Sequence, residues 1–448
     1  MGVSTLETPP RPVGADVPSP PGGGSALRIC WRALWTSRLV VLATGTLAVL
    51  QLGLVRGYQS YDPAGLTKPF GYFGNLLAAP FARWDSVWYL TIARFGYDHQ
   101  PARTAFYPLY PLLIKVVGFA LRSDLVAGVV VSLVCFAIGL VTLYRLVSLE
   151  FDEERARLTV MLIAFAPMAY FFSAVYTESL FLALTVGCFY QARRGRWARA
   201  CALGGLAAAS RNTGILLVVP LLILYLWGPR EDLATASVGR IARASAWGAR
   251  MHWGRALKPR YPVRLSLAWV LLVPAGAGAF VLFLALTSGN GLAPFGVEHL
   301  WYRHFSWPWG GVWQGAVAAW DGARQLIHGP PPPTYFKLAG GNALSVAGQN
   351  LMEFGFLIAG LLACVGVLRT LPFAYGAYVL VALAATLSYP VKPQPLASLP
   401  RYELVLFPFF IWAAGWVRRR GFGPQTIAIG AVLLGFFTAE FATWHFVA

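Results

Sequence analysis

One carboxylate stands among aromatic residues in a way that could support chemistry. Asp85 lies between two tryptophans in the stretch Arg83-Trp84-Asp85-Ser86-Val87-Trp88-Tyr89-Leu90. The stretch follows the first apolar run and is about as apolar as a helix at a membrane interface, where Trp and Tyr collect. It predicts a carboxylate held at the bilayer surface, where chemistry on a lipid head group takes place. The alternative is an aromatic belt in which Asp85 only caps a helix.

Asp85 and Glu178 are the two acidic residues in tight apolar and aromatic settings at the ends of apolar runs. Burial disfavours the charged form, so we expect the proton affinity of such a carboxylate to rise towards that of a useful base. We therefore predict Asp85 as a general base. For Glu178 the alternative is a carboxylate in the first turn of a helix, which the helix dipole stabilises by about 0.3 to 1 kcal/mol.

Two arginines are placed where a guanidinium could bind phosphate. Arg211 interrupts the apolar stretch 197–228, and Arg401 heads the last predicted outer loop, followed by Tyr402. Arginine grips phosphate through two parallel hydrogen bonds, and such cations can meet the charge of a leaving phosphate. An isolated arginine at membrane depth needs a partner, which favours a functional role for Arg211. For Arg401 the alternative is snorkelling to the interface.

The composition is that of an integral membrane protein. Of the 448 residues 57% are apolar and only 12% are charged, whereas a soluble domain is nearer a quarter charged. The formal net charge of +18 does not indicate nucleic acid, because the densest basic clusters fall in loops between apolar runs. Four of the five cysteines lie inside apolar runs without a CxxC spacing, so neither a disulfide framework nor a zinc site is predicted.

The N-terminal third is expected to bring Asp85 to the outer side of the membrane. We predict a disordered cytoplasmic tail over residues 1–25 and a first span at about 38–55, preceded by Arg28, Arg32 and Arg38. Residues 56–123 form the first outer loop, with helices at 70–95 and 106–122 that lie in the interface. If 106–122 were itself a span, every later segment would change sides.

The later loops support the first orientation. The arginines at 193–199 and the basic loop 229–264 should both be cytoplasmic, so an even number of crossings separates them. Two short helices that meet at Arg211 satisfy this condition. A Trp-rich outer loop at 288–346 follows, with a polyproline run at 330–333. The result is an all-α, polytopic fold from residue 26 to 448 with about eleven transmembrane helices, the N-terminus inside and the C-terminus outside.

The motifs W-D-S-x-W-Y-L, A-F-Y-P-L-Y-P (105–111) and S-A-V-Y-T-E-S-L-F (173–181) resemble those of the PIG-V family. These are the GPI mannosyltransferase II proteins and their prokaryotic relatives, within the GT-C glycosyltransferases. The resemblance implies a catalytic Asp85, a Glu178 that orients the acceptor or assists Asp85, and a dolichyl- or polyprenyl-phosphate mannose donor. Attack on the anomeric carbon from the face opposite the leaving phosphate would invert its configuration. The donor phosphate would bind to Arg401, Arg211 and Tyr402. The motif residues expected at the substrates are Trp84, Trp88, Tyr89, Tyr107, Tyr110, Tyr176 and Asn212.

The sequence therefore predicts a mannosyltransferase that acts on a lipid-linked donor and an extracytoplasmic acceptor. A nucleotide sugar is not expected, since there is no phosphate-binding glycine motif and no soluble domain. The Ala-, Gly- and Arg-rich composition is typical of a high-GC prokaryote, where a GPI precursor would not be the acceptor. No cofactor is predicted, and a divalent metal is left open. A transporter or lipid flippase, or a non-catalytic partner subunit, are the alternatives.

Overall fold

The computed structural model describes residues 23–98, 100–232, 259–329, 343–391 and 394–447. Within these ranges all regular structure is helical, apart from one isolated β-bridge between Arg303 and Val391. The tail was predicted over residues 1–25. Residues 1–22 lie outside the described ranges, and residues 23–25 belong to the first helix. The polyproline run and most of the basic loop 229–264 also lie outside them.

The N-terminal half contains the helices that carry the family motifs. In chain order they are α1 (Gly23–Leu52), η1 (Tyr58–Tyr61), α2 (Tyr72–Ala78), η2 (Ala79–Phe81), α3 (Ser86–Phe95), η3 (Pro101–Ala105), α4 (Leu109–Leu121), α5 (Asp124–Glu150), α6 (Glu153–Ala164), η4 (Ala169–Phe172), α7 (Glu178–Arg193), α8 (Trp197–Ser210), η5 (Asn212–Leu217) and α9 (Val218–Trp227).

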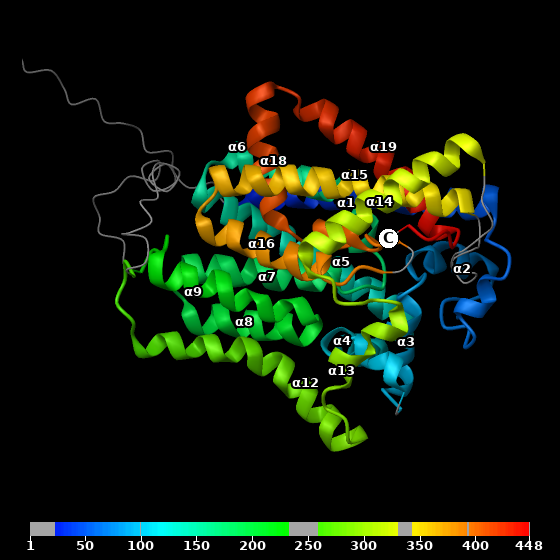
Figure 1. Ribbon diagram of the computed structural model, residues 1–448, viewed down its shortest axis with the longest axis horizontal. Coiled ribbons are helices and arrows are strands. Elements are labelled where there is room, and N and C mark those ends of the chain that lie inside the picture. Colours follow the sequence, from blue (N-terminus) through cyan, green and yellow to red (C-terminus); the bar gives the residue numbers. More distant parts are fainter. Residues whose placement is uncertain (1–22, 99, 233–258, 330–342, 392–393, 448) are drawn as a thin grey trace, which may run out of the picture.

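The C-terminal half completes the bundle. Its helices are η6 (Leu265–Leu271), α12 (Leu272–Ser288), α13 (Ala293–Gly296), η7 (Val297–Trp301), α14 (Trp307–His328), α15 (Ala343–Thr370), α16 (Phe373–Leu387), α17 (Leu399–Leu404), α18 (Phe407–Arg420) and α19 (Gly423–Ala442). In Figure 1 the helices α12, α8 and α7 lie in successive rows, with α16, α15 and α1 beyond them.

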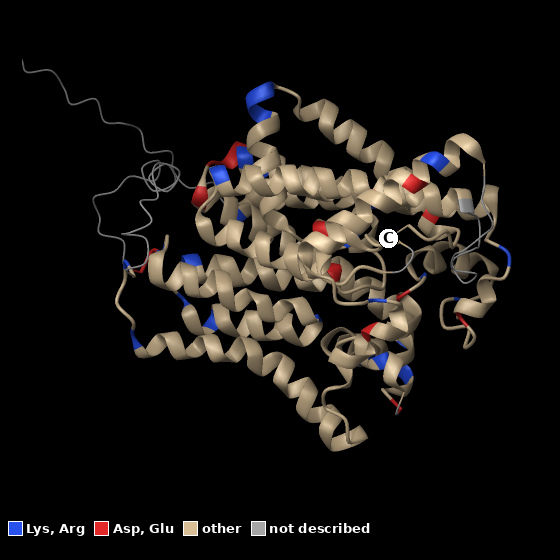
Figure 2. Ribbon diagram, in the orientation of Figure 1, with Lys and Arg blue, Asp and Glu red and all other residues tan. Residues whose placement is uncertain are grey.

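The protein has the character of a membrane protein. Five helical stretches are long and apolar enough to cross a bilayer, namely α1, α5, η6 with α12, α15 and α19. Between 28% and 44% of each apolar window is buried, so most of these side chains face outward, as lipid contact requires. Figure 2 shows long stretches of helix without a charged residue. The α4, η5–α9 and α16 stretches are shorter, and the count of eleven spans stays a prediction.

The two ends of the bundle are built differently. In Figure 1 the end of α9 and the start of η6, which border the basic loop, lie at the left, whereas α2 and α3 lie at the right. The short helices α2, α3 and α4 occupy the region in which we predicted interfacial helices. The segment that leads into α3, which includes Asp85, and the described residues that border the basic loop are therefore at opposite ends of the bundle.

Several predicted boundaries were wrong. The first span begins well before residue 38, so Arg28, Arg32 and Arg38 lie within α1. Arg38 is buried and donates hydrogen bonds to the carbonyl oxygens of Ala164 and Ala169, which explains how the helix tolerates it. The Trp-rich loop contains the 22-residue helix α14.

The packing of α8 against α12 depends on glycine. A Cβ atom added at Gly276 would lie 1.9 Å from the carbonyl oxygen of Gly205, and one added at Gly205 would lie 2.5 Å from that of Leu272. Small residues let helix backbones approach closely in membranes, where packing replaces the hydrophobic effect between helices. This contact fixes α8, whose last residue, Ser210, precedes Arg211.

We expect Gly276→Ala to lower the free energy of unfolding by about 1 to 3 kcal/mol, because the added methyl group collides with backbone that cannot rotate away. The matched control is Gly278→Ala in the same helix, where an added Cβ meets nothing within 4 Å. Thermal unfolding in detergent micelles measures both. Equal midpoints for the two variants would contradict the close contact.

Candidate active site

Asp85 is presented by a tight turn before α3. Trp84 adopts a left-handed backbone conformation (φ 54°), which is uncommon outside glycine. The backbone N–H of Asp85 donates to the Tyr176 hydroxyl at 3.1 Å, and that hydroxyl donates to the Arg83 carbonyl at 3.2 Å. Asp85 occupies the N-cap position of α3, yet its side chain makes no capping hydrogen bond. The carboxylate is thus directed elsewhere.

The partner of Asp85 is Arg401 on α17. A guanidinium N–H of Arg401 (Nη1) donates to Oδ2 of Asp85 at 2.6 Å, across 316 residues of sequence. The Arg401 side chain is 11% exposed and the Asp85 side chain 27%. Hydrogen bonds from a guanidinium to a carboxylate are among the shorter and stronger ones in proteins. The residue predicted as the base and the residue predicted to bind phosphate are therefore directly bonded to each other.

Glu178 extends this contact to a second arginine. Its Oε1 accepts a hydrogen bond from Nη1 of Arg211 at 3.0 Å and lies 3.6 Å from Nε of Arg401. Glu178 is the first residue of α7, and its side chain is only 1% exposed. Arg211 follows the last residue of α8 with an extended backbone (φ −154°, ψ 145°), so the two short helices do meet at this residue, as predicted.

The four residues form one carboxylate–arginine chain, in the order Asp85, Arg401, Glu178, Arg211. Each comes from a different segment, at or beside the end of a short helix. The chain holds two acids and two bases, which balances its charge in a region where an unpaired charge is costly. Two of its buried atoms, Nε of Arg401 and Oε2 of Glu178, have no hydrogen-bond partner among the described residues. Such atoms are typical of a site that binds a polar ligand.

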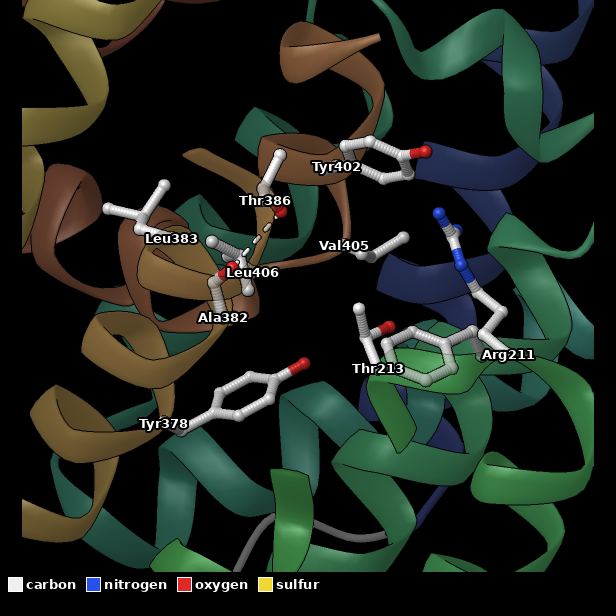
Figure 3. Close-up of a pocket in the computed structure, with 10 residues that line it drawn as sticks. Arg211, Thr213, Tyr378, Ala382, Leu383, Thr386, Tyr402, Val405 and Leu406 are labelled. Carbon is white, nitrogen blue, oxygen red and sulfur yellow. Dashed lines mark hydrogen bonds between the residues drawn. The ribbon is translucent and has the colours of Figure 1, made fainter. Parts of the chain in front are cut away.

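A pocket opens beside Arg211 and encloses about 370 Å³ of space, part of it open to solvent. Figure 3 shows Arg211 and Tyr402 at the same end, with the guanidinium carbon of Arg211 5.1 Å from the Tyr402 ring centre. Thr213 lies nearby, and the remaining walls are mostly apolar. They are formed by Phe181, Tyr378, Ala382, Leu383, Thr386, Val405 and Leu406. The arrangement places one cation at the end of a largely hydrocarbon-lined space.

Part of the chain is similar to a known protein family. A family model described as mannosyltransferase (PIG-V) matches residues 70–229, which include Asp85, Glu178 and Arg211. This part of the chain therefore resembles the PIG-V mannosyltransferases. It is 28% identical over 240 residues to GPI mannosyltransferase 2 of Drosophila pseudoobscura pseudoobscura, covering 48% of this chain and 52% of that one.

The other similarities cover less of the relatives or are more distant. GPI alpha-1,6-mannosyltransferase 2 of Mus musculus is 31% identical over 151 residues, 31% of this chain and 30% of that protein. The chain thus spans about half the length, or less, of the curated relatives it matches. A crystal structure of the Archaeoglobus fulgidus oligosaccharyltransferase aligns with 92% of this chain and 55% of that one, at 15% identity and a TM-score of 0.40.

Three of the predicted tyrosines lie at the carboxylate–arginine chain, namely Tyr402, predicted for the donor phosphate, and Tyr176 and Tyr89, predicted for the substrates. Tyr402 has its ring 5.4 Å from the guanidinium carbon of Arg401, and the Tyr176 ring lies at the same distance on another side. Tyr89 is buried against Tyr176, with its hydroxyl 3.4 Å from that of Thr177. Burial raises the pKa of Tyr89, and the carboxylates of Glu178 and Asp85 raise it further, so this phenol stays neutral.

Three more residues that were predicted at the substrates pack against aromatic side chains of the protein, namely Trp84, Trp88 and Tyr107. Trp84 contacts the C-terminal segment through Trp444 and Phe446, and Trp88 stacks on Phe106. Tyr107 packs against Phe280, and burial, together with the Glu298 carboxylate, raises its pKa to about 12.

Tyr110 and Asn212 also form contacts within the protein. Tyr110 is completely buried, and its hydroxyl bonds to the Gly128 carbonyl and to Ser132. The exposed Asn212 accepts from the backbone of Thr213. Tyr110 was predicted to contact a substrate, but it is a core residue in the structure and no part of its side chain is accessible.

The α16 wall of the pocket was not predicted. The pocket residues of this wall are Tyr378, Ala382 and Leu383. They lie inside an apolar helix, and the sequence of such a helix does not distinguish a residue that lines a pocket from one that faces lipid. Thr213, by contrast, directly follows the predicted site residues Arg211 and Asn212, so its place in the pocket could have been predicted from the sequence. Among the residues that the structure describes, no group of three His, Cys, Asp or Glu side chains comes together as metal ligands would.

The central carboxylate is tested by Glu178→Gln. Loss of this charge leaves the neighbouring Arg211 and Arg401 with one carboxylate between them, and we expect the free energy of unfolding to fall by about 3 to 5 kcal/mol. Asp98→Asn is the control, because Asp98 is 70% exposed and lies 3.9 Å from Arg103. Thermal unfolding of purified protein in detergent measures both. A loss no larger than that of the control would contradict the coupling of the four charges.

Proposed function

We propose that this PIG-V relative is an inverting glycosyltransferase of the GT-C type. It moves a mannosyl unit from a polyprenyl or dolichyl phosphate carrier to an acceptor outside the cytoplasm, which is a glycolipid, a glycan or a protein. The observation that carries the proposal is the carboxylate–arginine chain, in which a partly exposed Asp85 lies 2.6 Å from the guanidinium of Arg401. A base and an anion-binding group thereby stand side by side, as transfer from a sugar phosphate requires.

In the proposed reaction Asp85 takes the proton of an acceptor hydroxyl. The hydroxyl oxygen attacks the anomeric carbon, the bond from that carbon to the phosphate oxygen breaks, and the electron pair stays on the phosphate. Attack from the face opposite the leaving group inverts the configuration. A phosphate leaves as a weakly basic anion, so no second carboxylic acid is needed, unlike in the hydrolysis of a glycosidic bond. Arg401 and Arg211 offset the charge that develops on the phosphate.

The pocket beside Arg211 supports a lipid-linked donor. Its polar end carries Arg211 and Tyr402, and its walls are mostly apolar. A prenyl phosphate has the same division, with an anionic head and a hydrocarbon tail. A nucleotide sugar would need many polar contacts for its base and ribose, whereas the only polar side chains in the rest of the lining are the hydroxyl residues Thr213, Tyr378 and Thr386. The unpartnered Oε2 of Glu178 is an acceptor available to a sugar hydroxyl.

The orientation of the proposed site follows from the distribution of basic residues. The end of the bundle that borders the loop 229–264 is rich in arginine, which favours the cytoplasm for that end and for the N-terminus. Asp85 lies at the opposite end, and hence at the outer face of what we propose to be a prokaryotic cell membrane. The acceptor and donor sugar are then both extracytoplasmic, and the carrier reaches the site through the bilayer.

We expect Asp85→Asn to lower the rate of transfer by about 10² to 10⁴-fold, because the amide cannot accept the proton. The assay incubates membranes with labelled polyprenyl-phosphate mannose and follows loss of label from the carrier. Asp98→Asn, on an exposed side chain, should keep wild-type turnover. Near-normal turnover by a correctly folded Asp85→Asn protein would remove the mechanism.

Arg401→Ala tests the phosphate role. We expect the KM for the donor to rise about tenfold or more, and the KM for the acceptor to change much less, because the charge-assisted hydrogen bond to the donor phosphate is lost. Arg94→Ala on α3 is the control, because Arg94 is exposed. Equal effects of Arg401→Ala on the two substrates would count against a phosphate ligand.

A further inference from the structure

We infer that Arg303 is a positioning residue for the donor site, and that it acts by holding the segment that presents Arg401 and Tyr402. For its kinetic consequences the inference rests on the proposed function. Arg303 belongs to the strap, by which we mean residues 297–306 between α13 and α14. The strap lies between two parts of the site that are more than 300 residues apart in the sequence.

On one side the strap is bonded to the segment that leads into α17. The guanidinium of Arg303 donates to the Tyr389 carbonyl at 2.9 Å through Nη1 and to the Ala397 carbonyl at 3.4 Å through Nη2. The backbone of Arg303 pairs with Val391 in the isolated β-bridge. One side chain therefore joins both ends of the segment 389–397, and the second end lies four residues before Arg401.

On the other side the strap contacts the helix that carries Asp85. The Trp301 ring lies edge-on to Trp88 of α3, at 5.5 Å between ring centres, and 5.8 Å from Phe106. Trp88 is three residues after Asp85, within the first turn of α3. The strap thus touches α3, at the start of which the carboxylate lies, and the segment that leads into α17, which carries its guanidinium partner.

The backbone next to both contacts is in a costly conformation. Tyr302, which precedes Arg303, and Ser398, which follows Ala397, both have left-handed backbones with φ of 56° and 71°. Such residues persist only where surrounding contacts over-determine them, and they cluster at functional sites. Trp84, immediately before Asp85, is a third example. The hydrogen bond from Arg303 to Ala397 is well placed to hold the turn at Ser398 that starts α17.

The contacts also explain why this residue is arginine. Its rigid fork spans two carbonyl groups at once, while its Nε lies 3.7 Å from the Glu298 carboxylate of the same strap. The side chain is only 15% exposed, so these partners replace water. A lysine keeps the positive charge, but its single ammonium group cannot reproduce the fork.

The first arm of the test needs no substrate. Hydrogen exchange is followed at the backbone amides of residues 397–404 in wild type, Arg303→Ala and the control Arg324→Ala, an exposed arginine on the neighbouring helix α14. We expect about tenfold faster exchange in Arg303→Ala only, since each lost bond to a charged group weakens the local structure by that order. Unchanged exchange in Arg303→Ala would overturn the inference, whatever the enzyme transfers.

The second arm separates positioning from charge. With labelled polyprenyl-phosphate mannose, Arg303→Ala should raise the donor KM about tenfold with little change in acceptor KM, and should add nothing further in the Arg401→Ala background. Arg303→Lys should retain most of the defect. Full rescue by lysine, or additive effects in the double variant, would refute a role exerted through Arg401. If wild type does not use this donor while the exchange result holds, the proposed function fails and the positioning role stands.

Discussion

The protein depends on the pairing of charges that lie among membrane-spanning helices. Glu178 is almost completely buried, and Arg401 and Arg211 are nearly so. Each of these groups alone would carry a large desolvation penalty, and together with Asp85 they neutralise one another. Since two arginines share one oxygen of Glu178, removing any member leaves an unbalanced charge. The site is therefore a single electrostatic unit, and its residues cannot be exchanged independently.

This requirement explains where the helices break. Every member of the chain lies at or beside a helix end or within a helix of only six residues, where side chains can converge from different directions. Asp85 precedes α3, Glu178 opens α7, Arg211 follows α8 and Arg401 belongs to the short α17. A continuous membrane helix would direct such residues along one face only. Interrupted helices at membrane depth are tolerated because the freed backbone groups are buried within protein.

Much of the site could be read from the sequence, because isolated charges in apolar surroundings are conspicuous. Asp85, Glu178 and Arg211 were selected on that ground, and Arg401 because it heads the last predicted outer loop; the structure joins all four. The break at Arg211 was predicted because two basic loops require an even number of crossings between them.

Other features left no local signal. Tyr110 belongs to the same motif as Tyr107, yet it packs in the core, since a motif does not tell a substrate contact from a structural one. The α16 wall of the pocket and the strap at Arg303 depend on contacts between distant segments. The start of α1 was placed too late because buried partners allow arginines such as Arg38 within a helix.

The ion pair between Asp85 and Arg401 has a consequence for the timing of the proposed reaction. Oδ2 of Asp85 accepts the hydrogen bond from the guanidinium, so this oxygen is occupied and cannot also take a proton from a water molecule. In the proposed reaction the donor phosphate would compete for the same guanidinium and release Oδ2. The proposed base would then become available only when the donor binds, which would limit hydrolysis of the donor by water.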